Sequence, residues 1–198
     1  PMGTTITRQE FDEFYTHVPE RVLIILDEAY YEFAKNSPDY PNSMSYRYDN
    51  VITLRTFSKA YGLAGARIGY GFAHESLIEN LLKVKVPFEP SLSAQVAGLA
   101  ALDDVKFLAK TLKINQEGMA YLKQEFDKLG IQQVSSEANF ITTVWDSEET
   151  ASKLTQDLLE KGVIVRQLTG FGWPNCIRIS VGLDSENQKC IESLNQVL

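Results

Sequence analysis

The apolar residues of the first half fall into short continuous runs that predict strands. Residues 22–26 and 51–54 are such runs, rich in β-branched side chains. Continuous apolar runs of this length are typical of strands that are covered on both faces of a sheet. We therefore predict a fully buried strand at residues 22–26, a buried strand at 51–54, and a third strand at 67–73, where Gly69 and Gly71 would let a neighbour approach closely.

Helical periodicity and capping signals mark the helices. Thr7 followed by Glu10 fits a capping box, which predicts a short helix that ends before Pro19. Gly130 and Gly162 are suitable helix ends. The small, apolar residues 91–102 predict a buried helix. The other predicted helices cover residues 77–86, 103–129, 147–161 and 185–197.

The pattern changes after residue 130, where short strand-like runs alternate with helices. These runs cover residues 131–134, 139–144, 163–166 and 176–181. They predict a compact α+β unit with its own core. We place the first domain at residues 1–105 and a small second domain at 106–198, joined through the long helix; residues 35–50 are expected to be mostly loop.

Composition narrows the range of functions. The 198 residues carry a formal net charge of -7, which argues against nucleic acid as a general partner but leaves small anionic ligands open. No apolar run reaches membrane-spanning length. His17 and His74 stand alone, so we expect no metal site, and Cys176 and Cys190 are expected to be free thiols.

The segment of residues 56–69 is the most informative for chemistry. Lys59 follows the predicted strand 51–54 and lies between Thr56, Ser58 and two glycines, with Arg67 further on. By itself a lysine is most often a solvated surface residue. However, two hydroxyls and a guanidinium could bind one anion beside Lys59, a set that suits an imine-forming lysine next to a phosphorylated cofactor.

This segment resembles the Schiff-base lysine motif of fold-type I pyridoxal-phosphate (PLP) aminotransferases. Within that group it is most similar to histidinol-phosphate aminotransferases. Residues 26–30 (Leu-Asp-Glu-Ala-Tyr) and 177–182 (Ile-Arg-Ile-Ser-Val-Gly) support the resemblance. The resemblance covers essentially the whole chain, which corresponds to the later part of such an enzyme. We therefore expect this chain alone to be inactive, because other cofactor contacts of the family belong to the earlier part.

The resemblance implies a role for each residue of the motif. Lys59 would form the imine, and Asp27 would hold the pyridine nitrogen protonated. Tyr30 would donate to the ring oxygen. The phosphate would lie on Thr56, Ser58 and Arg67. On structural grounds alone, Asp27 is more often a cap or a surface ion-pair partner, and Arg67 could instead pair with Asp27 or Glu28.

Substrate recognition would come from the second domain. Arg178 alternates with Ile177 and Ile179, so its side chain should face away from the core. The resemblance makes Arg178 and Arg166 the arginines that bind an anionic substrate, with Asn139 as a pocket-lining residue. Two arginines suit a doubly charged phosphate monoester.

The resemblance thus implies an α/β fold: part of a mostly parallel, helix-covered sheet, then the small α+β domain. It implies a cytoplasmic homodimer that transfers an amino group between glutamate and imidazole-acetol phosphate in histidine biosynthesis. Three alternatives stay open: an aromatic amino-acid aminotransferase, a PLP-dependent phosphate-ester lyase of the same fold, and a fragment that keeps the fold without the chemistry.

Overall fold

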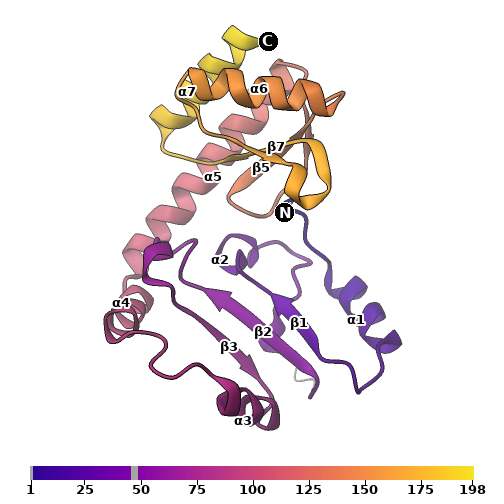
Figure 1. The fold of residues 1–198 in the computed structure, drawn as a ribbon, viewed down its shortest axis with the longest axis vertical. Coiled ribbons are helices and arrows are strands. Elements are labelled where there is room, and N and C mark those ends of the chain that lie inside the picture. Colours follow the sequence, from indigo (N-terminus) through magenta and orange to yellow (C-terminus); the bar gives the residue numbers. More distant parts are fainter. Residues whose placement is uncertain (1, 46–48) are drawn as a thin grey trace. The chain divides into compact units, whose positions relative to one another are not determined.

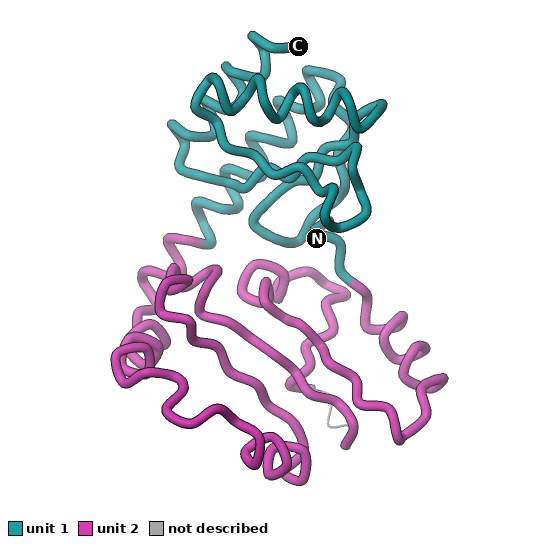
Figure 2. The backbone as a smooth tube through the Cα atoms, viewed as in Figure 1, with its two compact units in different colours: residues 1–5, 112–198 teal, residues 6–111 magenta. Residues whose placement is uncertain are grey.

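The polypeptide divides into two units, which are described separately. The structure is a computed structural model that describes residues 2–45 and 49–198. One unit comprises residues 6–111 and the other residues 1–5 with 112–198 (Figure 2). Helix α5 (Val105–Lys128) begins in the first unit and continues in the second.

A three-stranded sheet forms the frame of the first unit. The strands β1 (Ile24–Asp27), β2 (Val51–Thr56) and β3 (Gly69–Ala73) lie in that order (Figure 1). β1 and β2 are parallel, whereas β2 and β3 are antiparallel. The helices and short turns of this unit are α1 (Arg8–His17), α2 (Tyr31–Ala34), α3 (Glu75–Val84), α4 (Leu92–Asp103) and the 3-10 turns η1 (Ser43–Ser45) and η2 (Ala64–Ala66).

The capping box at the start of α1 is confirmed. The Thr7 hydroxyl accepts from the Glu10 amide at 3.2 Å, and the Thr7 amide donates to the Glu10 carboxylate at 2.7 Å. Phe11 of this helix is buried against Ile24 and Val51. The local signal thereby places one apolar face of the helix on the sheet.

The prediction that residues 22–26 form a fully buried strand was wrong. The strand begins at Ile24, and the side chain of Ile25 is 60% exposed. Alternate residues of a strand point to opposite faces, so only the face that carries Ile24 packs on α1. In the described part of the chain, the face that carries Ile25 is not similarly covered.

Helix α4 is also less buried than its composition predicted. Only Ala94 and Gly98 of this helix are buried. They lie four residues apart, and a methyl group at Gly98 would come within 3.0 Å of Ile68. The helix thus packs through its small residues, while Leu92, Val96 and Leu99 form an exposed apolar stripe at helical spacing.

The second unit is an antiparallel sheet with helices. The sheet order is β4-β5-β7-β6, with every pair antiparallel. Its apolar core includes Leu122, Phe126, Ile141 and Ile177. The elements are β4 (Gln132–Val134), β5 (Phe140–Val144), α6 (Glu148–Glu160), β6 (Arg166–Leu168), η3 (Thr169–Phe171), β7 (Trp173–Ser180) and α7 (Asp184–Val197). The α/β class is confirmed.

The predicted strand at residues 163–166 was wrong in its position. β6 begins only at Arg166, and Ile164 is 86% exposed. Helix α6 ends at Glu160, Gly162 follows in the left-handed region with φ of 77°, and the Val163 amide donates back to the Leu158 carbonyl at 2.9 Å. This helix-end motif uses residue 163 to cap the helix, so the chain reaches the sheet a few residues later.

Within the described ranges, none of the helices combines the length and apolar character that crossing a membrane requires. The same residues contain no cluster of three or more potential metal ligands.

Gly118 provides a test of packing in the second unit. A β-carbon there would lie 2.4 Å from Val181 Cγ1 and 2.8 Å from Asn187 Nδ2. We expect Gly118→Val to lower the free energy of unfolding by roughly 1–3 kcal/mol, because the extra atoms overpack a buried contact. Urea unfolding followed by circular dichroism measures the change. Gly170→Ala is the control, since Gly170 has open space around it; equal effects of the two changes would contradict this account.

Candidate active site

The parallel pairing of β1 and β2 brings two candidate residues to one edge of the first sheet. Asp27 pairs with Leu54, and Thr56 lies two residues further along β2. Because residues two apart share a face, Asp27, Leu54 and Thr56 project to the same side. The carboxyl edge of parallel strands is the usual place for a ligand in open α/β sheets.

A looped segment between β2 and β3 carries the lysine. Thr56 pairs with Gly69, so residues 57–68 leave and re-enter the sheet at one point. A β-carbon at Gly69 would lie 2.7 Å from the Arg55 carbonyl oxygen, which is the close approach expected there. The Thr56 hydroxyl accepts from the Ser58 amide at 3.0 Å and sets the first turn of the loop.

Lys59 lies beside Tyr30. The Lys59 amine is 5.5 Å from the centre of the Tyr30 ring, within the range of a cation–π contact. The nearby residues Phe57 and Ala60 are buried, whereas Lys59 is exposed. The buried neighbours anchor the turn and leave the amine accessible.

Arg67 has a left-handed backbone, with φ of 54°. Its guanidinium donates to the Ala64 carbonyl at 2.8 Å. In the described part of the chain Arg67 forms no ion pair, so the structure does not support the alternative that it pairs with Asp27 or Glu28. Asp27 instead accepts a hydrogen bond from the Ala29 amide at 3.1 Å.

The second unit aligns the two arginines that were expected to bind substrate. Arg166 of β6 and Arg178 of β7 are direct partners across the antiparallel ladder. Like charges placed opposite each other repel. Each guanidinium lies over an aromatic ring, Arg166 at 5.0 Å from the centre of Phe171 and Arg178 at 4.7 Å from that of Phe140.

Neither arginine has an acidic partner among the described residues. Ile177 and Ile179 are buried and Arg178 is only partly so, which confirms that its side chain leaves the core. Asn139 precedes β5, and its carbonyl accepts from the Val181 amide at 2.9 Å.

Comparison with known proteins identifies the family. Residues 1–194 match the family described as aminotransferase class I and II. The chain belongs to this family. It is 45% identical over 198 residues to a histidinol-phosphate aminotransferase of Akkermansia muciniphila, and 44% identical over 200 residues to one of Nitrosococcus oceani. Both alignments cover 100% of this chain and 53% of the relative, so the chain spans about half the length of these relatives.

A solved structure shows the same fold. The histidinol-phosphate aminotransferase of Sinorhizobium meliloti, in complex with pyridoxal-5'-phosphate, matches with a TM-score of 0.91 and 30% identity. The match covers 100% of this chain and 54% of that chain.

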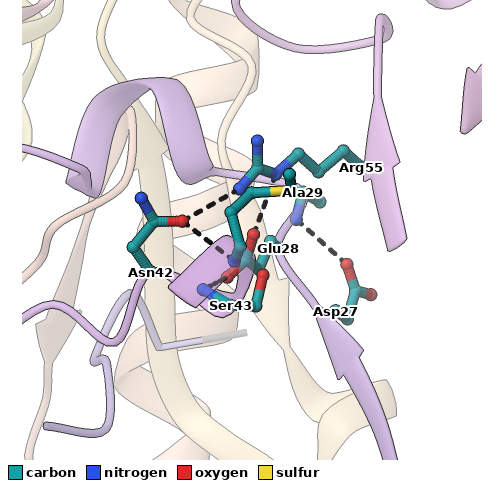
Figure 3. Close-up of polar contacts among 7 residues, drawn as sticks. Asp27, Glu28, Ala29, Asn42, Ser43 and Arg55 are labelled. Carbon is teal, nitrogen blue, oxygen red and sulfur yellow. Dashed lines mark hydrogen bonds and ion pairs between the residues drawn. The ribbon is translucent and has the colours of Figure 1, made fainter. Parts of the chain in front are cut away.

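The first unit also contains a buried ion pair that sequence reasoning missed. Arg55 Nε donates to Glu28 Oε2 at 2.8 Å, and the two side chains are only 8% and 6% exposed (Figure 3). The other oxygen of Glu28 accepts from the Ser43 amide at 3.2 Å. Burial by itself lowers the pKa of Arg55, but the hydrogen bonds to Glu28 and Tyr70 raise that pKa above its ordinary value. Alternation along the strands could have indicated this pair. Glu28 follows Asp27 and Arg55 follows Leu54, so once Asp27 and Leu54 are paired the next two residues share the opposite face.

Glu32 is a second buried carboxyl group in the same unit. Its side chain is 4% exposed, and its Oε2 has no hydrogen-bond partner among the described residues. Burial raises the pKa of Glu32, and the nearby charges of Arg55 and Lys35 only partly oppose this. Burial also raises the pKa of Tyr40 and of Tyr61. The folded protein therefore retains the proton on Glu32 to a higher pH than the unfolded chain does.

Glu32 makes stability depend on pH. Its pKa is higher in the folded than in the unfolded chain, so its contribution is full below the unfolded value of 4.5 and is lost as pH rises through the folded value. We expect Glu32→Gln to become more stable than the unsubstituted chain as pH rises through this window. Urea midpoints between pH 4 and 8 measure the difference. The matched change Glu79→Gln, at an exposed carboxyl on α3, should show no such trend; a parallel trend would contradict the assignment.

Proposed function

We propose that this chain is the lysine-bearing part of a PLP-dependent histidinol-phosphate aminotransferase. The observation that carries the proposal is the position of Lys59, whose amine lies 5.5 Å from the Tyr30 ring, in the unit whose paired strands end at Asp27 and Thr56. Membership of the aminotransferase family and the names of the relatives support it.

The chemistry of the donor set fits pyridoxal phosphate. Lys59 is accessible and provides an amine for the aldehyde. Asp27, exposed at the strand end, provides a carboxylate for a protonated ring nitrogen. Thr56, Ser58 and Arg67 provide hydroxyls and a guanidinium, which are donors that a phosphate prefers. The constrained left-handed backbone of Arg67 is consistent with a binding role, because strained residues cluster at functional sites.

Each residue has a distinct task in this proposal. Pyridoxal phosphate supplies an electron sink for the negative charge that develops on the substrate carbon. Asp27 keeps the ring nitrogen protonated, and Tyr30 donates a hydrogen bond to the ring oxygen. Lys59 would hold the cofactor through its Nζ atom, and the same amine, when free, would move a proton to and from the substrate carbon.

The aligned arginines support a doubly charged substrate. Arg166 and Arg178 face each other across one ladder with no acidic partner in the described residues, so an anion between them would relieve their repulsion. A phosphate monoester such as histidinol phosphate meets this requirement, and Asn139 is retained as a pocket residue. Glutamate as amino donor, a homodimer and a cytoplasmic location belong to the same proposal and rest on the family resemblance. The proposed domain division at residues 1–105 and 106–198 rests on the change in sequence pattern along the chain.

Lys59 is expected to be the residue that binds the cofactor covalently. Treatment of the chain with pyridoxal phosphate and borohydride, followed by peptide mapping, should place a pyridoxyl group on Lys59. Lys59→Ala should abolish that label, whereas Lys106→Ala, at an exposed lysine of α5, should leave it unchanged. A label on another lysine with Lys59 unmodified would refute the assignment.

Arg166→Ala and Arg178→Ala should each weaken the binding of histidinol phosphate by about one to two orders of magnitude. The reason is the loss of a charge-assisted hydrogen bond, which contributes roughly 1.5–3 kcal/mol. Isothermal calorimetry with the phosphate monoester measures the affinity. Arg21→Ala, at an exposed arginine of the other unit, is the control. Wild-type affinity in Arg166→Ala would remove the main support for the phosphorylated substrate.

A further inference from the structure

We infer that the buried Glu28–Arg55 pair is a positioning element that orients Tyr30 against Lys59. The inference rests on the proposed function, because it assigns the pair a role toward the cofactor lysine. Neither Glu28 nor Arg55 belongs to the set proposed to touch the cofactor.

The pair lies behind the proposed site. The Glu28 amide donates to the Leu54 carbonyl at 2.9 Å, so the strand pairing continues one step beyond Asp27. Alternation then places Glu28 and Arg55 on the face opposite to Asp27 and Thr56. The close-up shows the Asp27 carboxylate apart from the Glu28–Arg55 contacts (Figure 3).

The pair is tied to the segment that carries Tyr30. The Arg55 guanidinium lies 3.4 Å from the centre of the Tyr31 ring, while its Nε holds Glu28. Tyr31 is the first residue of α2 and directly follows Tyr30. One guanidinium thus restrains the chain on both sides of residues 29 and 30, and the Tyr30 ring in turn lies 5.5 Å from the Lys59 amine.

Stability alone is a weak reason for such a pair. Burying two charges costs desolvation free energy, and apolar residues of similar size are often as stable or more so. Arginine can bind a carboxylate and stack on a ring at once, because its guanidinium is planar. The geometry therefore points to orientation of the Tyr30 segment as the function of the pair.

The test measures the rate at which the Lys59 amine is acylated in the absence of pyridoxal phosphate. Lysines are acylated with acetic anhydride, and mass spectrometry gives the rate at Lys59 relative to the exposed Lys106. Loss of the cation–π contact should raise this relative rate about two- to fivefold. Circular dichroism establishes that each variant is folded.

Two variants and one control separate the possibilities. The double change Glu28→Met with Arg55→Met replaces the ion pair by apolar side chains, and Tyr31→Leu removes the stacking ring while the ion pair stays. Tyr31→Phe keeps the ring and is the control. We expect the first two to show the raised rate and Tyr31→Phe to match the unsubstituted chain.

The outcomes distinguish this inference from the proposed function. If folded Tyr31→Leu reacts at Lys59 as Tyr31→Phe does, the positioning role is overturned, and this holds even if the double variant does not fold. If the rate rises as expected but pyridoxal phosphate does not label Lys59 in the unsubstituted chain, the positioning role stands and the proposed function fails.

Discussion

The parallel pairing of β1 with β2 is the constraint on which the candidate site depends. Its register places Asp27 beside Leu54 and so fixes which of the following residues share a face. One face receives Asp27 and Thr56, and the other receives Glu28 and Arg55. A shift of one residue would exchange these faces and bury the proposed chemistry.

The second unit places two positive charges opposite each other. Its antiparallel ladder puts Arg166 opposite Arg178, which is unfavourable for two cations in the absence of an anion. The rings of Phe171 and Phe140 lie under the two guanidiniums. Cation–π contacts partly offset the repulsion while leaving the hydrogen-bond donors of both arginines available. This arrangement would suit the anion site that we propose for these two arginines.

Two buried carboxyl groups, Glu28 and Glu32, lie in the first unit on the short segment that follows β1. Glu28 pairs with Arg55, whereas Glu32 has no ion-pair partner among the described residues and burial raises its pKa. Both residues lie within five positions of Asp27, so one short segment combines exposed and buried carboxyl groups. Two carboxyl groups of the same residue type therefore meet different surroundings, one an ion pair and the other an unpaired buried site.

The sequence by itself indicated most of the local elements and the residues of the candidate site. The capping box at Thr7 and the glycines at 130 and 162 act through neighbouring backbone groups, so they could be recognised without the fold. The strand followed by Lys59 and the alternation around Arg178 are equally local. Only the tertiary structure decided which charges meet: Glu28 with Arg55 rather than with Arg67, and Arg166 opposite Arg178. It also decided that Ile25 and the apolar stripe of α4 are exposed, because burial depends on which segments pack against a face and not on the composition of that face.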